Sequence, residues 1–122
     1  MPLRVMIVDD ALFMRNILKD IFLRAGFEVV AEADNGEDVL PLYRQLAPDL
    51  VTLDIIMPRR SGLDALHELM AAEPAARVVM VSALGQDALV LEAVEAGACD
   101  FIVKPFKEAK VLEVVHRVTA RD

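Results

Sequence analysis

Near its start the sequence reads Val5-Met6-Ile7-Val8-Asp9-Asp10, four apolar residues followed by two aspartates. An apolar run without polar interruption is typical of a strand that is buried on both faces of a parallel sheet. A second such run, Val78-Val79-Met80-Val81, is followed by Ser82. Both runs therefore predict inner strands that carry polar residues at their C-terminal ends.

Five short apolar or β-branched segments alternate with longer stretches that have helical spacing. The expected strands are Leu3–Val8, Glu28–Glu32, Leu50–Leu53, Arg77–Ser82 and Cys99–Val103. The intervals between them leave room for one helix of about 12 residues and two short loops each. This alternation predicts an α/β fold with a parallel sheet and helices on both faces. Charged residues frame Glu28–Glu32, so we expect this strand at an edge of the sheet.

Glycine and proline mark where the helices are expected to begin and end. The expected helices run from about Leu12 to Ala25, from Asp34-Asn35-Gly36 onward, from Ser61-Gly62 to Glu73, between Gly85 and Gly97, and from about Lys107 to Thr119. Pro41 falls within the second helix, where a proline removes one backbone hydrogen bond and tends to cause a kink. We therefore expect the second helix to be irregular or to begin late.

Composition narrows the class of protein. The chain has 122 residues, of which 56% are hydrophobic, and its formal net charge is −7. This size and apolar content predict one domain, 1–122, with a packed core. The sequence shows no apolar run near the roughly 20 residues of a membrane helix and no export leader, so we expect a cytoplasmic protein without membrane contact. The negative charge argues against nucleic-acid binding, and the single Cys99 cannot form an internal disulfide or a zinc site.

Acidic and polar residues follow the expected strands at the end where parallel α/β sheets bind ligands. They are Asp9, Asp10, Asp54, Ser82 and Lys104. A single aspartate at a strand end can simply be a helix cap or a turn residue. Carboxylates about 5 Å apart, however, repel each other by roughly 3 kcal/mol per pair at an effective dielectric constant near 20. One lysine does not balance three such groups, so the cluster predicts a bound cation.

An all-oxygen donor set with few protein ligands suits Mg²⁺, which keeps several waters and also binds phosphate oxygens. Beside such an ion a carboxylate can attack phosphorus and form an acyl phosphate. The ion and a lysine would stabilise the negative charge that spreads over the phosphoryl oxygens. The strand ends therefore predict phosphoryl chemistry on an aspartate.

The ordered set of these residues resembles the receiver domain of two-component response regulators. It comprises Asp9-Asp10, Asp54 within Leu53-Asp54-Ile55-Ile56-Met57-Pro58, Gly62, Ser82-Ala83 and Lys104-Pro105-Phe106. The resemblance covers essentially the whole chain and is greatest to stand-alone chemotaxis regulators of the CheY type. It implies a flavodoxin-like, doubly wound sheet with five helices and the strand order 2-1-3-4-5 that is known for CheY.

The resemblance also implies how the acidic residues act. Asp54 would accept a phosphoryl group from a histidine kinase. Asp9, Asp10, Asp54 and the backbone carbonyl of Ile56 would hold Mg²⁺, with Asp9 acting through a water. The protein would then be a phosphoacceptor that assists its own phosphorylation and dephosphorylation, rather than an enzyme.

The remaining implied roles concern the switch that follows phosphorylation. Lys104 would pair with a phosphoryl oxygen, and the Lys104–Pro105 peptide bond would be cis. Ser82 would move to hydrogen-bond the phosphoryl group, which would let Phe101 rotate inward. The face formed by the fourth helix, the fifth strand and the fifth helix would change and bind an output protein.

We expect a protein partner, because the chain ends with the fifth helix and leaves no room for a DNA-binding domain. By resemblance the flagellar motor switch is the favoured target, and a phosphatase is a further expected partner. Leu91 lies among charged residues, opposite the apolar face of Leu89, Val90, Ala93 and Val94 on the fourth helix. We hypothesise that Leu91 contacts the partner or a second copy of the chain.

Two apolar positions concern the lifetime of the phosphoryl group. Ile56 and Leu84 lie two residues beyond Asp54 and Ser82, respectively. Side chains at these positions would flank the route of an attacking water. We therefore hypothesise that they affect how long the phosphoryl group survives.

The sequence leaves other functions open. A single-domain receiver can also serve in a phosphorelay or in a sporulation-type pathway. A Mg²⁺-dependent aspartyl phosphohydrolase would use Asp54 as its nucleophile, but such enzymes typically need an acid–base carboxylate where this chain has Ile56. A flavodoxin-like cofactor binder would need a Ser/Thr/Gly-rich phosphate loop, which these strand ends lack. A receiver-like module that no longer takes phosphate would have no need of the complete acidic set.

Overall fold

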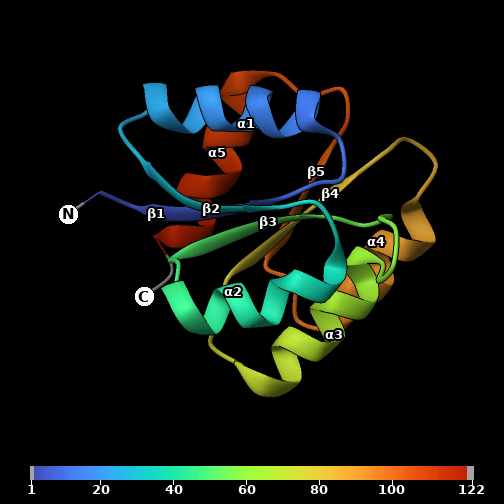
Figure 1. Cartoon of the computed structure of the whole chain (residues 1–122). Helices are drawn as coiled ribbons and strands as arrows, with labels where there is room; N and C mark the ends of the chain where they lie inside the picture. Colours follow the sequence, from blue (N-terminus) through green and yellow to red (C-terminus); the bar gives the residue numbers. More distant parts are fainter. Residues whose placement is uncertain (1, 121–122) are drawn as a thin grey trace.

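The computed structural model describes residues 2–120, which form a parallel five-stranded sheet between two layers of helices (Figure 1). The strands are β1 (Arg4–Val8), β2 (Glu28–Ala33), β3 (Leu50–Asp54), β4 (Val78–Ser82) and β5 (Asp100–Val103). Their order is β2-β1-β3-β4-β5, and all neighbouring pairs are parallel. This confirms the predicted α/β class and strand order, and it places β2 at an edge as expected.

The helices begin and end close to the predicted glycines and prolines. They are α1 (Leu12–Arg24), α2 (Val39–Leu46), α3 (Gly62–Ala72), α4 (Asp87–Glu95) and α5 (Glu108–Thr119). A 3₁₀ turn, η1 (Gly36–Asp38), precedes α2, so the second helix begins late as predicted. Pro41 consequently lies in the first turn of α2, where backbone N–H groups have no acceptor within the helix.

Two separate apolar cores hold the layers together. Helices α1 and α5 cover one face of the sheet, and α2, α3 and α4 cover the other (Figure 1). Side chains alternate between the two faces along β1: Val5 and Ile7 pack beneath α1 and α5, whereas Met6 and Val8 face the other layer. Full burial of one such side chain stabilises the fold by about 1.5–3 kcal/mol. Cys99 is partly buried at the margin of the core beneath α1 and α5.

None of the helices within residues 2–120 combines the length and the apolar character needed to cross a bilayer.

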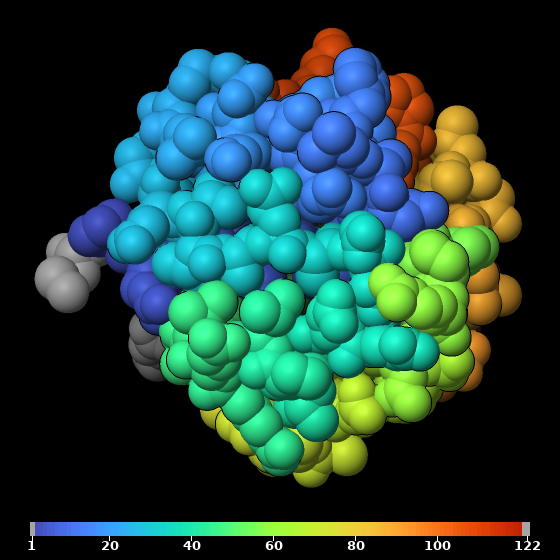
Figure 2. Space-filling model, viewed as in Figure 1, coloured from blue at the N-terminus to red at the C-terminus, as the bar shows by residue number. Residues whose placement is uncertain are grey.

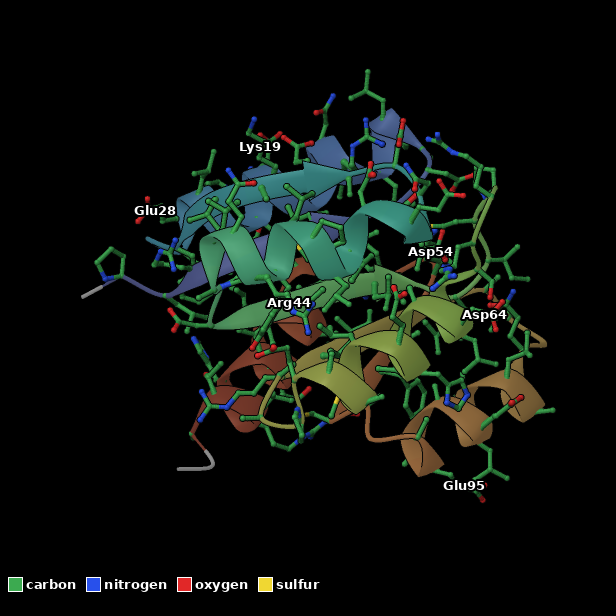
Figure 3. The ribbon with its side chains drawn as sticks, turned by 60° about the horizontal axis from the view of Figure 1, so that its bottom comes forward. Lys19, Glu28, Arg44, Asp54, Asp64 and Glu95 are labelled. Atoms are coloured by element: carbon green, nitrogen blue, oxygen red, sulfur yellow. The ribbon has the colours of Figure 1, made fainter. Side chains whose placement is uncertain are left out.

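The topology places the C-terminal ends of all strands at one edge of the sheet. The chain leaves β1 toward the α1 layer and leaves β3 toward the α3 layer, so adjacent strands β1 and β3 diverge into opposite layers. Such a divergence opens a crevice beyond the strand ends, which is where open α/β sheets bind ligands. Figure 3 shows Asp54 at this edge, at the end of β3.

The loop after β3 is held by close backbone contacts. A Cβ atom at Gly62 would lie 1.7 Å from the carbonyl oxygen of Asp54, so only glycine fits there. The Gly62 N–H donates to the carbonyl of Ile55 at 2.6 Å, and the Gly36 N–H donates to that of Arg60 at 3.1 Å. Figure 2 shows the resulting surface, where the yellow-green segment after β3 lies beside the turquoise segment after β2. These contacts fix the position of Asp54.

Candidate functional site

Three carboxylates converge at the C-terminal edge of the sheet. Asp9 and Asp10 follow β1, and Asp54 is the last residue of β3. One carboxylate oxygen from each lies within 4.8 Å of the others. Asp9 and Asp54 are buried, with exposed fractions of 1% and 7%, whereas Asp10 is exposed. The structure thus brings together the three aspartates that the sequence predicted to meet.

Lys104, in the loop after β5, completes what we call the acidic pocket: Asp9, Asp10, Asp54 and Lys104. The Lys104 Nζ donates to Asp9 Oδ2 at 3.0 Å and to Asp54 Oδ2 at 3.3 Å. The peptide bond between Lys104 and Pro105 is cis. A single ammonium group thus contacts two buried carboxylates, while the third faces solvent.

The balance of charge in the acidic pocket shifts the pKa values of Asp54 and Lys104. Burial, and next the charge of Asp9, raise the pKa of Asp54 to about 6, although Lys104 opposes them. Burial acts to lower the pKa of Lys104, but its hydrogen bond to Asp9 and the charge of Asp54 outweigh it and raise that pKa. The pocket therefore holds more negative charge than the lysine neutralises, and its oxygen-only donors fit a hard divalent cation such as Mg²⁺.

Ser82 ends β4 at the same edge of the sheet. The strand register pairs Asp54 with Val81, so Ser82 lies one residue further along the neighbouring strand. Its side chain is buried, with 1% exposed, and its Oγ has no hydrogen-bond partner among the described residues. A buried hydroxyl without a partner costs about 1–3 kcal/mol, which a suitable acceptor would recover.

A second buried hydroxyl shares this property but not this location. Thr52 Oγ1 also has no partner within residues 2–120, and the residue is fully buried. Thr52 lies within β3, between strands β1 and β4, and precedes Asp54 by two residues. It therefore offers a matched control for the polar side chains that end the strands.

An apolar groove adjoins Ser82 on the α4 side of the sheet. It has a volume of about 350 Å³, and we call it the α4–β5 groove. Its lining comprises Ser82, Ala83, Leu84, Gly85, Asp87, Val90, Leu91, Val94, Phe101 and Val103. Leu91 is 60% exposed and Phe101 is 38% exposed. The groove connects the end of β4 to the helix on which we expected a partner contact.

Helix α4 is packed less fully than its apolar pattern indicated. Ala93 is buried, whereas Leu89 and Val90 are only partly buried. Val94, which shares their face of the helical wheel, is 44% exposed and lines the α4–β5 groove. The reason is that one margin of α4 borders this groove instead of the core.

Two apolar side chains on the loops after β3 and β4 are also exposed. Ile56 is 57% exposed and Leu84 is 78% exposed. Both follow strands that end at the acidic pocket, as the sequence hypothesis requires. Their exposure leaves them free to shield the pocket from water or to meet another protein.

One polar contact at this edge could not be predicted from the pattern of residues. The guanidinium of Arg15, on α1, donates to the backbone carbonyl of Asp9 at 2.6 Å. A bond to a backbone carbonyl leaves no signature in the residue types that it joins. The only available hint was an arginine at a helical position near an aspartate pair.

Comparison with known proteins assigns this geometry to a family. The family model of the response regulator receiver domain matches residues 5–116 of this chain. The chain belongs to the response regulator receiver family. The strand order, the three convergent aspartates and the lysine after β5 are thus features of a receiver domain.

Relatives of this receiver domain include chemotaxis proteins. It is 52% identical to the chemotaxis protein CheY of Thermotoga maritima over 116 residues, which cover 95% of this chain and 97% of the relative. It is 51% identical to CheY of Bacillus subtilis, over 93% of this chain and 95% of the relative. Among solved structures, the CheX–CheY–BeF₃–Mg²⁺ complex from Borrelia burgdorferi contains a chain with 42% identity and a TM-score of 0.93. That match covers 97% of this chain and 90% of the other.

Proposed function

We propose that this receiver domain, residues 1–122, accepts a phosphoryl group on Asp54 and relays a chemotaxis signal to a protein partner. The observation that carries the proposal is the acidic pocket itself, in which three carboxylates lie within 4.8 Å of one another. A cluster that repels itself in this way is stabilised when a cation binds, and the bound cation also offsets the negative charge that a phosphoryl group on Asp54 adds. Receiver-family membership favours this chemistry over a cofactor site or the hydrolysis of external phosphate esters.

The first step is nucleophilic attack by a carboxylate oxygen of Asp54 on the phosphorus of a phosphohistidine. A P–O bond forms as the P–N bond breaks, and the imidazole of the histidine kinase leaves with that electron pair. Asp9, Asp10, Asp54 and the backbone carbonyl of Ile56 would hold Mg²⁺. When bound, this ion offsets negative charge on the phosphoryl oxygens. The presence of Mg²⁺ in the Borrelia complex supports this assignment.

Lys104 orients the product. In the structure its ammonium group is shared between Asp9 and Asp54. Once Asp54 is an acyl phosphate, its charge lies on the phosphoryl oxygens, and the ammonium can donate to one of them. Loss of Lys104 should therefore weaken the link between the phosphoryl group and the loop after β5.

Ser82 and Phe101 convert this local change into a change of surface. The Ser82 hydroxyl, which has no partner among residues 2–120, gains a phosphoryl oxygen as its acceptor when the start of the β4–α4 loop moves toward the phosphoryl group. That movement opens the α4–β5 groove, and Phe101 turns from its half-exposed position into it. Phosphorylation thereby favours a conformation that is already accessible, which is a population shift.

Ile56 and Leu84 set the lifetime of the phosphoryl group in this proposal. Hydrolysis requires a water to approach phosphorus opposite the Asp54 oxygen. Apolar side chains beside that route offer the water no hydrogen bond. The acyl phosphate should therefore persist longer than it would beside polar side chains at the same positions.

The proposed partners are inferred from the surfaces of the unphosphorylated and the phosphorylated protein. A cytoplasmic histidine kinase would donate at the acidic pocket, and the output protein would bind the face of α4, β5 and α5 that includes Leu91. The chemotaxis relatives support the flagellar motor switch as that output protein. The Borrelia relative forms a complex with CheX, which supports a further partner, such as a phosphatase.

One experiment tests the proposal directly. Wild-type protein and Asp54→Asn are incubated with acetyl phosphate and Mg²⁺, and their intact masses are measured. We expect a gain of one phosphoryl group in the wild type and none in the variant. Thr52→Val, a change two residues earlier in β3, serves as the matched control and should still gain the group. An unmodified wild type, or equal modification of Asp54→Asn, would contradict the proposal.

A further inference from the structure

Arg15 links the first helix to the edge of the acidic pocket. Its side chain is only 14% exposed, although it carries a full charge. Nη1 donates to the backbone carbonyl oxygen of Asp9 at 2.6 Å, and Nε donates to Glu32 Oε1 at 3.3 Å. Glu32 lies on edge strand β2, so the guanidinium joins α1, β2 and the end of β1. An arginine that is this well buried and bonded has a fixed position.

The carbonyl that Arg15 holds belongs to the peptide unit between Asp9 and Asp10. Because a peptide unit is planar, fixing its carbonyl also fixes its N–H and the direction in which the chain continues to Asp10. The rest of Asp9 is already restrained: its N–H donates to Ala33, and its two carboxylate oxygens accept from the Ala11 N–H and from Lys104. The exposed Asp10 side chain, by contrast, depends on the orientation of this peptide unit.

We propose that Arg15 is a positioning residue, whose bond to the Asp9 carbonyl aims the Asp10 carboxylate relative to that of Asp9 so that the pocket binds Mg²⁺. This inference rests on the proposed function, because it assumes that the acidic pocket takes the ion. Some groups hydrogen-bond to a metal ligand and orient it without touching the metal. Their removal typically weakens metal binding by about 10–100-fold. Arg15 itself touches neither the ion nor the phosphoryl group.

A purely electrostatic role for Arg15 predicts the opposite result. A guanidinium near a divalent-cation site repels the cation, so its removal should tighten Mg²⁺ binding. A positioning role predicts weaker binding, because the two carboxylates lose their alignment. The direction of the change in affinity therefore separates the two roles.

The chain offers a matched control on the same helix. Lys19, one turn further along α1, donates to the other carboxylate oxygen of Glu32 at 3.3 Å. Figure 3 shows Lys19 well separated from Asp54, and its side chain is 43% exposed. Lys19→Met thus removes one positive charge and one contact to Glu32 without touching the Asp9 carbonyl.

The test measures the Mg²⁺ dissociation constant by isothermal titration calorimetry in wild type, Arg15→Met, Arg15→Lys and Lys19→Met. We expect the constant to rise about 10-fold in Arg15→Met and to stay within about 2-fold of wild type in Lys19→Met. Arg15→Lys should be intermediate, because one ammonium cannot serve the Asp9 carbonyl and Glu32 equally well. With acetyl phosphate, Arg15→Met should need more Mg²⁺ for half-maximal phosphorylation but reach a near-wild-type rate at saturation.

The outcomes separate this inference from the function on which it rests. If wild type binds Mg²⁺ and Arg15→Met binds it equally well or more tightly, the positioning role is wrong and the proposed function stands. Absence of Mg²⁺ binding in wild type would overturn both. Thermal unfolding without Mg²⁺ checks that each variant is folded. Should Arg15→Met not unfold cooperatively, Arg15→Lys decides the question, since weaker binding than wild type is expected there too.

Discussion

The acidic pocket and the α4–β5 groove are neighbours at one end of the sheet, yet they are built in contrasting ways. The pocket consists of charged groups on strand ends, with Lys104 bonded to two of the carboxylates. The groove consists of apolar side chains left exposed between a loosely packed helix and an edge strand. The pocket is joined by hydrogen bonds and has more negative than positive charge, whereas the groove is lined by apolar side chains that remain exposed. A chemical change in the acidic pocket can therefore be followed by a structural rearrangement of the α4–β5 groove.

Ser82 lies between the two regions. It ends β4 beside the pocket, and it lines the groove. Within residues 2–120 its hydroxyl has no hydrogen-bond partner, so a phosphoryl oxygen in the pocket offers it an acceptor. The comparison thus predicts that variants of the pocket, of the groove and of Ser82 will have separable effects.

The largest effect should be on stability and should come from the pocket. In the folded protein the pKa of Asp54 is raised to about 6 from an ordinary value of 3.8, so the native state binds its proton more tightly than the unfolded chain. The free energy of unfolding therefore falls as pH rises from about 4 to 6, and the contribution of protonated Asp54 is fully lost above that range. A shift of this size corresponds to at most about 3 kcal/mol.

Asp54→Asn should consequently be more stable than wild type at pH 7.5 by about 2–3 kcal/mol, with little difference near pH 4. Urea unfolding without Mg²⁺ at both pH values measures this difference. Thr52→Val, which removes a buried hydroxyl two residues earlier, should show no such dependence on pH. If the difference in the free energy of unfolding between wild type and Asp54→Asn were equal at both pH values, burial and neighbouring charge would not raise the pKa of Asp54.

The next largest effect should come from Ser82. It should concern only the coupling between the phosphoryl site and the position of Phe101. In Ser82→Ala the pocket keeps its charges, so beryllofluoride and Mg²⁺ should still bind. The ratio of the inward to the outward population of the Phe101 side chain should fall by about 10-fold relative to wild type. A change of this size is within the usual range for coupling between two sites. The chemical shifts of Phe101 and Val103 in NMR spectra measure this ratio.

Ser61→Ala provides a matched control for Ser82→Ala. Ser61 Oγ accepts from the Asp64 N–H and caps α3, so this change removes a hydroxyl in the neighbouring loop. It should lower the free energy of unfolding by about 1 kcal/mol but leave the Phe101 ratio unchanged. If both variants shift the ratio alike, the effect reflects general loosening and not a bond to the phosphoryl group.

A smaller effect should come from the groove and concern partner affinity. Leu91→Ser removes an exposed apolar side chain from the groove, and we expect about 5-fold weaker binding of the motor-switch protein to the beryllofluoride form. Fluorescence anisotropy measures the affinity. Leu23→Ser, at a half-exposed leucine near the end of α1, should bind as wild type does. Unchanged affinity in Leu91→Ser would remove this residue from the interface.

The sequence predicted the fold because the signals for its elements are local. Uninterrupted apolar runs marked the inner strands, glycines marked the helix ends, and Pro41 marked the late start of α2. The strand order came from the family resemblance, since local patterns do not specify which strands pair. The convergence of Asp9, Asp10 and Asp54 was predictable because a parallel sheet brings its strand ends together.

The sequence did not predict features that depend on packing or on backbone contacts. Val94 has the spacing of a core residue, but its exposure depends on how far α4 reaches over β5. The bond from Arg15 to the Asp9 carbonyl involves no second side chain that a pattern could reveal. Likewise, that the hydroxyls of Thr52 and Ser82 have no partner in the described part of the chain follows from the full three-dimensional arrangement.

The smallest effect should come from the exposed apolar side chains at the rim of the pocket. Ile56→Asn and Leu84→Glu each place a hydrogen-bonding group where water must approach the phosphoryl group. We expect each change to shorten the lifetime of the acyl phosphate by about 3-fold, which corresponds to roughly 0.7 kcal/mol in the barrier. Release of inorganic phosphate after removal of acetyl phosphate gives the rate.

This last prediction completes the contrast between the two regions when it is paired with Leu91→Ser. The rim variants should change the lifetime and leave affinity for the motor-switch protein intact, whereas Leu91→Ser should do the reverse. Such a result would mean that the pocket sets the duration of the signal and the groove sets how strongly it is received. If a rim variant changed both quantities, Ile56 or Leu84 would belong to the partner's binding surface as well. The loops after β3 and β4 would then serve both chemistry and recognition.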